Sequence, residues 1–340
     1  MAKILLPVIF LICLSIAVLT VISPTLFPLY FIYILFAIAA FFVFSKIDFE
    51  VLSLFSNHFY VISILLLIVT LFIGQVTRGT IRWIPIGAFT LQPTEIVRPF
   101  LLVFFANYLT SEKLKLSRLA KAFLLLALPI VLIFVQPSLG VTILTIIGFL
   151  GVLLSTGFKK RYIFLGLFVL VAVTPLFWRV LAPYQKQRIT SFVNPQSDPL
   201  GSGYNSIQAM ISVGEGRLFG LGLGKGVQTQ LAFLPERHSD FIFASVSEEL
   251  GFLGAGLVLL AVFLILFQII KLMENASSPA ARAYLSGLFA VIFAEVFIHV
   301  GMNLGLLPIT GLPFPLLSAG GSSLLATMMG LGIALAARHR

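Results

Sequence analysis

The chain has 340 residues, of which 59% are hydrophobic and only 10% are charged, and its formal net charge is +10. Soluble domains are nearer a quarter charged, so this composition excludes an ordinary soluble protein and indicates a polytopic membrane protein. In a soluble protein the positive charge would suggest nucleic acid, but here it first reports topology, because short cytoplasmic loops retain lysine and arginine.

Apolar segments long enough to cross about 30 Å of hydrocarbon recur along the whole chain. The sequence therefore predicts an all-α integral membrane protein with about ten transmembrane helices in a single domain, residues 1–340. The first segment is interpreted as a helix rather than a signal peptide, because no small-residue cleavage site follows it and further spans do. The predicted spans are 4–22, 27–45, 57–74, 94–110, 119–135, 139–157, 162–181, 241–270, 281–305 and 316–337.

The distribution of lysine and arginine predicts that both termini lie in the cytoplasm. With this orientation the outside turns 23–26 and 136–138 carry no basic residue, whereas the inside segments are basic. Two outer segments, 75–93 and the long loop 182–240, are basic exceptions. Their charge suits either a solvated loop or an anionic lipid headgroup such as a pyrophosphate. The lone cysteine, Cys13, excludes an internal disulfide.

Acidic residues gather where the long loop meets the eighth predicted span, at Glu236, Asp240, Glu248 and Glu249. Asp240 is interpreted either as a helix N-cap or as a catalytic carboxylate at the membrane surface. Glu248 and Glu249 fall within the outer leaflet, where charged groups face a bundle interior or a cavity. They are therefore either polar contacts between helices or part of a site.

Other polar features are less specific. Glu295 and His299 are four residues apart on one helix face and are interpreted as a buried hydrogen-bonded pair, with a proton relay or metal ligation as alternatives. The glycine-rich segment 220–226 has neither phosphate-loop spacing and is interpreted as a flexible loop. Residues 301–323 interrupt two apolar spans, which predicts a structured outer vestibule, because non-helical backbone at that depth must be buried or line a cavity.

Several stretches, in the same order along the chain, make it resemble the SEDS family of cell-wall polymerases, which includes RodA and FtsW. Arg237 and Pro313 favour a RodA-like member, with FtsW-like as the alternative. The resemblance implies ten helices, a large extracytoplasmic loop between helices 7 and 8, and peptidoglycan glycosyltransferase activity on lipid II. The matching stretches are Arg82-Trp83-Ile84, Gln92-Pro93-Thr94-Glu95, Gln136-Pro137-Ser138-Leu139-Gly140, Leu234 to Gly251 and Leu306 to Ser323.

The resemblance also implies roles for individual residues. Asp240 matches the essential acid of the family, as a general base or as a ligand of a divalent cation, Mg²⁺ or Mn²⁺. Ser138 and Ala319 depart from the family pattern, which usually has Asp and Tyr at these positions. The substrate-binding candidates are Arg82, Glu95, Arg98, Arg217, Lys225, Arg237, His238, Glu248, Glu249 and Ser322.

A member of this family is expected in the bacterial cytoplasmic membrane, acting in cell elongation and rod shape. The resemblance implies a class B penicillin-binding protein as partner, and no feature of the sequence predicts binding to nucleic acid. Two other functions remain open from the sequence. One is a lipid II flippase, which intramembrane acids such as Glu295 would suit, and the other is a non-catalytic scaffold of the wall-synthesis complex.

Overall fold

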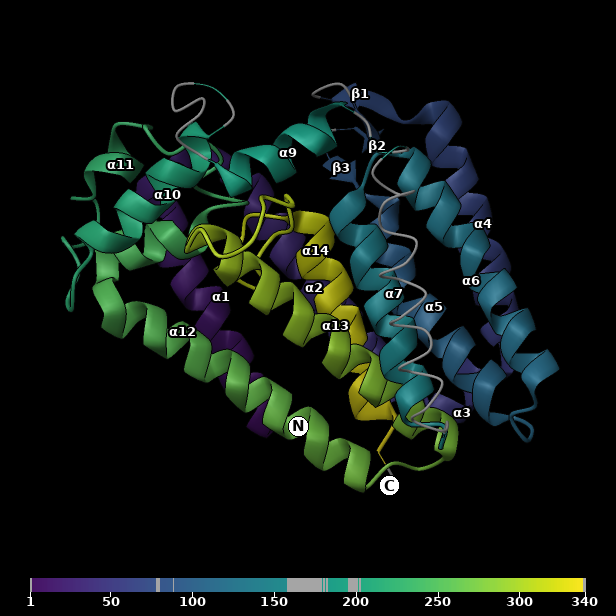
Figure 1. Cartoon of the computed structure of the whole chain (residues 1–340). Helices are drawn as coiled ribbons and strands as arrows, with labels where there is room; N and C mark the ends of the chain where they lie inside the picture. Colours follow the sequence, from purple (N-terminus) through teal and green to yellow (C-terminus); the bar gives the residue numbers. More distant parts are fainter. Residues whose placement is uncertain are drawn as a thin grey trace.

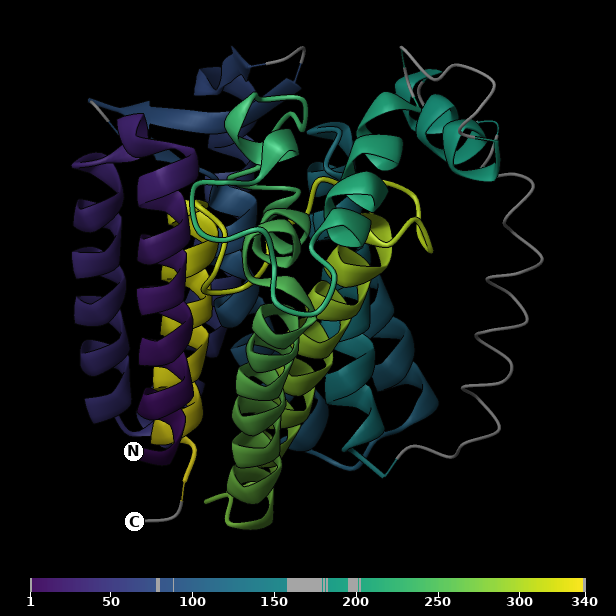
Figure 2. The ribbon, with the colours of Figure 1, turned by 90° about the vertical axis from the view of Figure 1, so that its left-hand side faces the viewer.

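The computed structural model is a helical bundle with a small sheet and short helices at one end (Figures 1 and 2). It describes residues 2–77, 80–87, 89–157, 179, 181, 183–194, 201 and 203–338. The helices are α1 (Ala2–Ile22), η1 (Pro24–Leu26), α2 (Leu29–Lys46), α3 (Phe49–Leu54), α4 (Ser56–Ile73), α5 (Pro93–Thr110), α6 (Leu116–Val135), α7 (Leu139–Leu154), α9 (Pro183–Val193), α10 (Tyr204–Glu215), α11 (Val227–Gln230), α12 (Ile242–Glu274), α13 (Pro279–Asn303) and α14 (Gly321–Ala336).

The helical fold class is confirmed. Among the described residues, six helices are long and apolar enough to cross a membrane, namely α1, α2, α4, α6, α12 and α13, and two shorter ones, α7 and α14, are also apolar. The predicted spans coincide with these helices and with α5 to within a few residues, except 162–181, which lies outside the described residues apart from 179 and 181. Proline 137 separates α6 from α7, as its missing N–H predicts.

A three-stranded antiparallel sheet fills part of the outer segment 75–93, for which the sequence predicted no strand. It consists of β1 (Gln75–Thr77), β2 (Thr80–Ile86) and β3 (Phe89–Leu91), in the order β1-β2-β3. β2 and β3 form a hairpin in which Ile84 pairs with Leu91 and Ile86 with Phe89. The hairpin carries Arg82 over the end of the bundle, directly before the start of α5.

Small residues allow the central helices to pack closely. α13 packs against α7, and α14 against α2, in the middle of the bundle (Figure 1). A Cβ on Gly151 of α7 would lie 2.6 Å from the Cβ of Ala290 on α13, and one on Gly287 would lie 3.0 Å from the carbonyl oxygen of Gly148. In a membrane, where the hydrophobic effect does not drive helices together, the van der Waals contacts made by such close approach are a main source of helix association.

Helix α12 is broken at Gly251, whereas the sequence predicted one continuous span over 241–270. The φ of Gly251 is 69° and its ψ is −166°, a conformation essentially restricted to glycine. The break frees backbone groups that a helix would pair, and the loop after α10 binds them (Figure 2). The four bonds are Leu221 N to Glu248 O (2.9 Å), Gly222 N to Glu249 O (2.9 Å), Phe252 N to Arg217 O (2.8 Å) and Leu253 N to Leu218 O (3.2 Å).

Candidate functional site: an acidic and basic pocket at one end of the bundle

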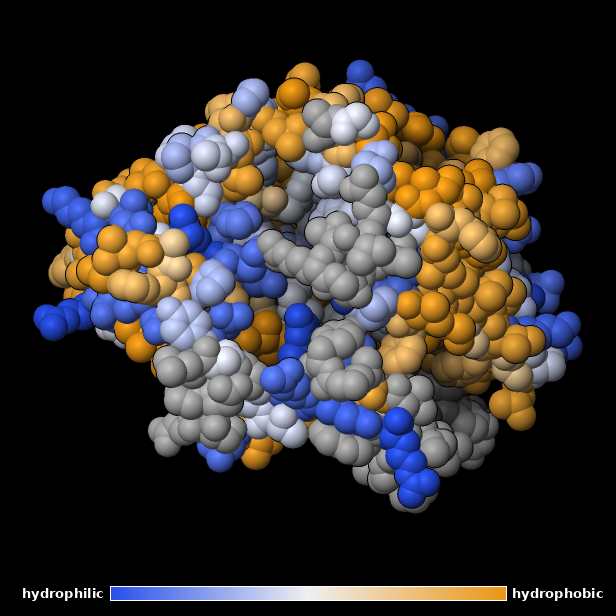
Figure 3. Space-filling view, turned by 90° about the horizontal axis from the view of Figure 1, so that it is seen from above, coloured by the Kyte–Doolittle hydropathy of each residue, from blue (hydrophilic) through white to orange (hydrophobic). Residues whose placement is uncertain are grey.

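A pocket of about 650 Å³ lies at the end of the bundle that carries the sheet and α9. Seen from this end, hydrophilic side chains gather in the left and lower parts of the face, and a broad hydrophobic area lies on its right-hand side (Figure 3). The wall of the pocket is formed by the loop before α12, the connection between α13 and α14, and the starts of α5 and α7. Its polar lining residues are Arg82, Thr90, Gln92, Glu95, Ser138, Arg188, Glu236, His238, Ser239, Asp240, Thr310 and Ser323.

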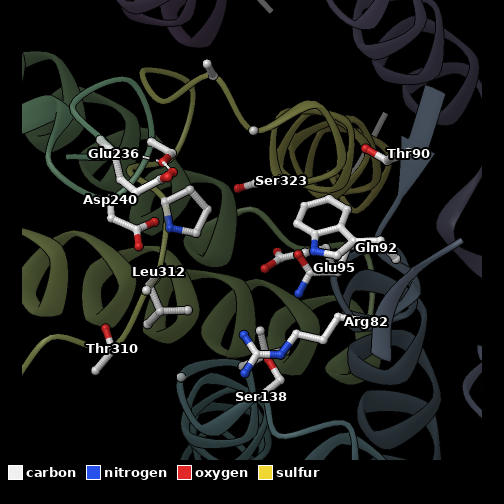
Figure 4. Close-up of a pocket in the computed structure, with 18 of the residues that line it drawn as sticks. Arg82, Thr90, Gln92, Glu95, Ser138, Glu236, Asp240, Thr310, Leu312 and Ser323 are labelled. Atoms are coloured by element: carbon white, nitrogen blue, oxygen red, sulfur yellow. Dashed lines mark hydrogen bonds between the residues drawn. The ribbon is translucent and has the colours of Figure 1, made fainter. Parts of the chain in front are cut away.

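Asp240 faces this pocket with Glu236 beside it (Figure 4). The interpretation of Asp240 as an N-cap is wrong, because Phe241 occupies the N-cap of α12 and makes no side-chain capping hydrogen bond. Glu236 accepts a hydrogen bond from the Ser239 hydroxyl over 2.9 Å, which holds its carboxylate against the same loop. His238 also lines the pocket, with Nε2 3.9 Å from a Glu236 oxygen. One wall of the pocket is therefore acidic.

Arg82 lies across the pocket from Asp240 (Figure 4). Its guanidinium donates to the carbonyl oxygen of Gln136 over 3.0 Å and to that of Pro137. Gln136 is the C-cap of α6 and Pro137 follows it, so both carbonyls lie where the backbone has no helical partners. The β2 strand and the α6–α7 turn thus fix the guanidinium beside Ser138 in the pocket wall.

Arg188 of α9 also lines the pocket, and the sequence did not single it out as a site residue. Its Nη1 donates to the carbonyl oxygen of Ile309 over 3.2 Å. Gly311, with a φ of 70°, lies beside both Asp240 and Arg188, since a Cβ there would be 3.5 Å from Asp240 Oδ2 and 3.7 Å from Arg188 Nη1. The only signal in the sequence was the positive charge of the long loop, which did not place any one of its arginines.

A buried ion triad extends behind the pocket. Arg98 Nη2 lies 2.5 Å from Glu95 on the same helix, and Nη1 lies 3.4 Å from Glu295 on α13. Glu95 lines both the pocket and a cavity of about 20 Å³ behind it, which is large enough for one water. Glu95 and Arg98, two of the substrate-binding candidates, therefore pair with each other. The predicted Glu295–His299 hydrogen bond is absent, because His299 Nδ1 contacts the carbonyl oxygen of Leu312 at 2.8 Å and its Nε2 has no hydrogen-bond partner within the described part of the chain.

The structure places two other predicted acids away from the pocket. Glu248 accepts hydrogen bonds from the N–H groups of Gln228 (2.7 Å) and Thr229 (3.0 Å) at the start of α11. Glu249 accepts one from the Gln230 side chain over 3.1 Å. Both carboxylates therefore hold the outer loop onto α12, and neither is paired with an arginine in the part of the chain that the structure describes.

The remaining predicted residues also lie outside the pocket lining. Arg237 donates to the carbonyl oxygen of Ile22 over 3.1 Å, at the end of α1. Arg217 and Lys225 are exposed on the loop that fills the break in α12. The Ser322 hydroxyl accepts a hydrogen bond from the Gln92 N–H over 2.8 Å, which joins α14 to the residue before α5.

Among the described residues, no group of three or more His, Cys, Asp and Glu side chains could hold a metal ion. Asp240 and Glu236 nevertheless share one wall of the pocket. Mg²⁺ is commonly bound by one or two carboxylates together with substrate phosphates, rather than by a cage of protein ligands. The donor set fits a divalent cation that arrives with a phosphorylated substrate.

The fold and the pocket together define a multi-pass helical membrane protein with carboxylates and arginines collected at one end of the bundle. The chain belongs to the FtsW, RodA and SpoVE family of cell cycle proteins, whose model matches residues 1–340.

Curated relatives agree with this assignment. The peptidoglycan glycosyltransferase MrdB of Escherichia coli K12 is 37% identical over 281 residues, which cover 82% of this chain and 76% of the relative. The stage V sporulation protein E of Bacillus subtilis is 36% identical over 306 residues, covering 88% and 82%.

Solved structures share the fold. A chain from work on the structural coordination of polymerization and crosslinking by a peptidoglycan synthase complex aligns with a TM-score of 0.86 and 27% identity, covering 98% of this chain and 96% of that one. The Rod shape determining protein RodA of Thermus thermophilus aligns with a TM-score of 0.74 and 25% identity, covering 98% and 94%.

Proposed function

We infer that the chain is a peptidoglycan glycosyltransferase that polymerises lipid II into glycan strands and releases undecaprenyl pyrophosphate. The main observation in support of this function is that Asp240, Arg82 and Arg188 line the same pocket. A transferase for this substrate needs a base for the attacking hydroxyl and cations for the leaving pyrophosphate. Relatives at 36–37% identity carry the glycosyltransferase name, which supports the same reaction.

The proposed setting is the bacterial cytoplasmic membrane, with ten helices, both termini in the cytoplasm and the loop 182–240 outside, between helices 7 and 8. The distribution of lysine and arginine in the sequence supports this orientation. In this orientation the pocket opens to the outer face of the membrane. Its lining residues come from β2, α9 and the loop before α12. A lipid-linked sugar could then reach the pocket while its chain stays in the bilayer.

The proposed reaction is a single inverting displacement. The 4-hydroxyl of the acceptor GlcNAc attacks the anomeric carbon of the donor MurNAc, its proton passes to Asp240, and the bond from that carbon to the pyrophosphate oxygen breaks. Asp240 acts as the base because it faces the pocket and belongs to a loop anchored by Asn303 of α13 and Ser318 of the α13–α14 connection. Inversion in one step requires the base and the leaving group on opposite sides of the sugar.

Arg82 and Arg188 are the proposed partners of the pyrophosphate oxygens. Guanidinium groups suit this role, because their forked donors bind phosphate oxygens in pairs. Arg82 is held by two main-chain carbonyls on one edge, which fixes its orientation before substrate arrives. Three other basic residues lie outside the pocket and remain candidates only for contacts there, with the lipid headgroup or with a partner protein. They are Arg217, Lys225 and Arg237.

A divalent cation is proposed to accompany the substrate pyrophosphate, held by Asp240 with Glu236 nearby. When bound, it would supply positive charge that stabilises the departing pyrophosphate. Ser138 and Ala319 both line the pocket, so the two departures from the family pattern change its wall near the base and the arginines.

We propose a class B penicillin-binding protein as partner and a role in cell elongation. The similar chain from a peptidoglycan synthase complex supports the partner, and the similarity to MrdB and RodA supports elongation. The single transmembrane helix of such a partner would dock on a lipid-exposed face of the bundle.

The test is a polymerisation assay in liposomes with lipid II and Mg²⁺ or Mn²⁺, with and without the cognate partner, its transpeptidase blocked. Long glycan strands from the wild-type chain, but not from Asp240→Ala, are expected. Lipid II that crosses the bilayer without forming strands would contradict the proposed function and indicate a flippase. Wild-type activity in Asp240→Ala would remove Asp240 from the chemistry.

A further inference from the structure

Three consecutive main-chain carbonyls beside the pocket accept hydrogen bonds from the last residue of α13 and from the segment that joins α13 to α14. The Ala319 N–H donates to His238 O over 2.9 Å, the Ser318 hydroxyl to Ser239 O over 2.7 Å, and the Asn303 amide to Asp240 O over 3.2 Å. The backbone that carries the Asp240 carboxylate is therefore held from one side over its full length.

Asn303 makes the most demanding of these contacts. It is the last residue of α13 and has no exposed surface. Its Nδ2 donates both to Asp240 O and, over 2.7 Å, to His299 O, while its Oδ1 accepts from the Ala244 N–H over 3.0 Å. Ala244 lies in the first turn of α12, where N–H groups have no helical partner. No residue of α12 itself caps this turn, so Asn303 caps it from another helix.

Only a short amide side chain fits this set of partners. Aspartate accepts but cannot donate to the two carbonyls, and glutamine is one methylene too long for a position with no exposed surface. Leucine or alanine would leave the Ala244 N–H and the Asp240 carbonyl buried without these partners. The Asn303 side chain thus links the first turn of α12, at Ala244, to the main chain of Asp240. The direction of α12 and the position of Asp240 therefore depend on the same contact.

We propose that Asn303 is a positioning residue for Asp240, assisted by Ser318. This inference rests on the proposed function, since it assigns Asn303 to the placement of the proposed base. Asn303 does not line the pocket and touches no substrate; it acts through the backbone of Asp240. A displacement of a reacting group by about 1 Å costs on the order of 100-fold in rate, which is the scale of effect expected here.

The experiment compares Asn303→Ala and Ser318→Ala with Tyr284→Phe as a matched control. Tyr284 is also buried on α13 and donates one side-chain hydrogen bond, to Gly330 O over 3.0 Å, away from the pocket. Two quantities are measured for each purified variant in detergent. The first is amide hydrogen exchange in peptides covering residues 236–246, and the second is kcat and KM for lipid II.

Asn303→Ala is expected to speed exchange of the Ala244 amide at least about tenfold, because a buried hydrogen bond is lost. It is also expected to lower kcat by about 10- to 100-fold with KM within about twofold. Ser318→Ala should act in the same direction more weakly, and Tyr284→Phe should change neither quantity.

Unchanged exchange and unchanged kcat in Asn303→Ala would overturn the proposal, as would an equal loss of kcat in Tyr284→Phe, which would indicate a general packing effect. If Asn303→Ala does not fold, Ser318→Ala decides by the same criteria. A wild-type chain that forms no strands would contradict the proposed function, while the exchange measurement would still decide whether Asn303 positions the loop.

Discussion

Single residues in the pocket are held mainly through backbone groups of distant elements. Arg82 rests on the carbonyls that end α6, and Arg188 donates to Ile309 in the α13–α14 connection. Gly311 lies beside Asp240 and Arg188 with a φ of 70°, a backbone conformation that other residues rarely adopt. The site therefore depends on where helices end, which is also where backbone groups are free to bind side chains.

Arg188→Ala is predicted to raise KM for lipid II by about 10- to 100-fold, because a charge-assisted contact to the pyrophosphate is lost. Lys186→Ala is the matched control, since Lys186 lies on the same helix and does not line the pocket. Initial polymerisation rates over a range of lipid II concentrations measure both variants. An unchanged KM in Arg188→Ala would exclude Arg188 from binding the headgroup.

At the scale of elements, the break in α12 joins the helix to the outer loop. Backbone bonds from Arg217, Leu218, Leu221 and Gly222 replace the helical bonds that Gly251 interrupts. Glu248 and Glu249 strengthen the same junction by binding α11. This explains why two carboxylates occur at the start of an apolar helix. They satisfy the free N–H groups and side chains of a loop, which offsets the cost of their burial.

Gly251→Ala is predicted to lower the free energy of unfolding by about 1–3 kcal/mol, because its backbone conformation is strained for any other residue. Its Cβ would also lie 2.3 Å from the backbone nitrogen of Gly220. Gly256→Ala, in the same helix with nothing within 4 Å of its Cβ, should instead gain up to about 1 kcal/mol. Thermal unfolding in detergent measures both, and equal midpoints would contradict the role of the break.

The triad of Glu95, Arg98 and Glu295 joins α5 to α13 behind the pocket. All three side chains are at least nine-tenths buried. Arg98→Met is predicted to destabilise the protein by about 3–5 kcal/mol, because it leaves two carboxylates buried without their cation. Arg282→Met, at an exposed position of α13, should change stability by less than about 0.5 kcal/mol. A melting temperature of Arg98→Met equal to that of Arg282→Met would show that the triad does not stabilise the bundle.

At the scale of the whole molecule, the sequence was sufficient for the elements that depend on local hydropathy. The apolar runs predicted α1, α2, α4 and α6 closely, because each must cover about 30 Å with apolar side chains. The fold class followed from the same signal.

The parts that the sequence did not predict depend on contacts between distant segments. Strand β2 pairs with β1 and β3, and its sequence has no long alternation of apolar and polar residues. The break at Gly251 depends on a loop that docks from outside the helix. Asn303 acquires its role at the end of α13, and Arg188 acquires its role from the contact of α9 with the α13–α14 connection, neither of which local propensity specifies.

The proposed orientation in the membrane is open to a direct test, because Cys13 is the one cysteine of the chain. In a Cys13→Ser background, Lys225→Cys is predicted to react with a membrane-impermeant maleimide in intact spheroplasts. Lys113→Cys should react only after the membrane is permeabilised, since it lies before α6 at the end of the bundle away from the pocket. Both lysines are exposed, so accessibility is matched. The reverse pattern would place the pocket in the cytoplasm.

The central claim is that Asp240 is the base of a lipid II polymerase, and the rate of strand formation by Asp240→Asn tests it most directly. The substitution keeps the size of the side chain and removes its basicity, and Asp48→Asn, at an exposed position in the α2–α3 connection, is the matched control. The predicted result is a rate at least about 100-fold below wild type for Asp240→Asn and an unchanged rate for Asp48→Asn. A wild-type rate in Asp240→Asn would contradict the claim.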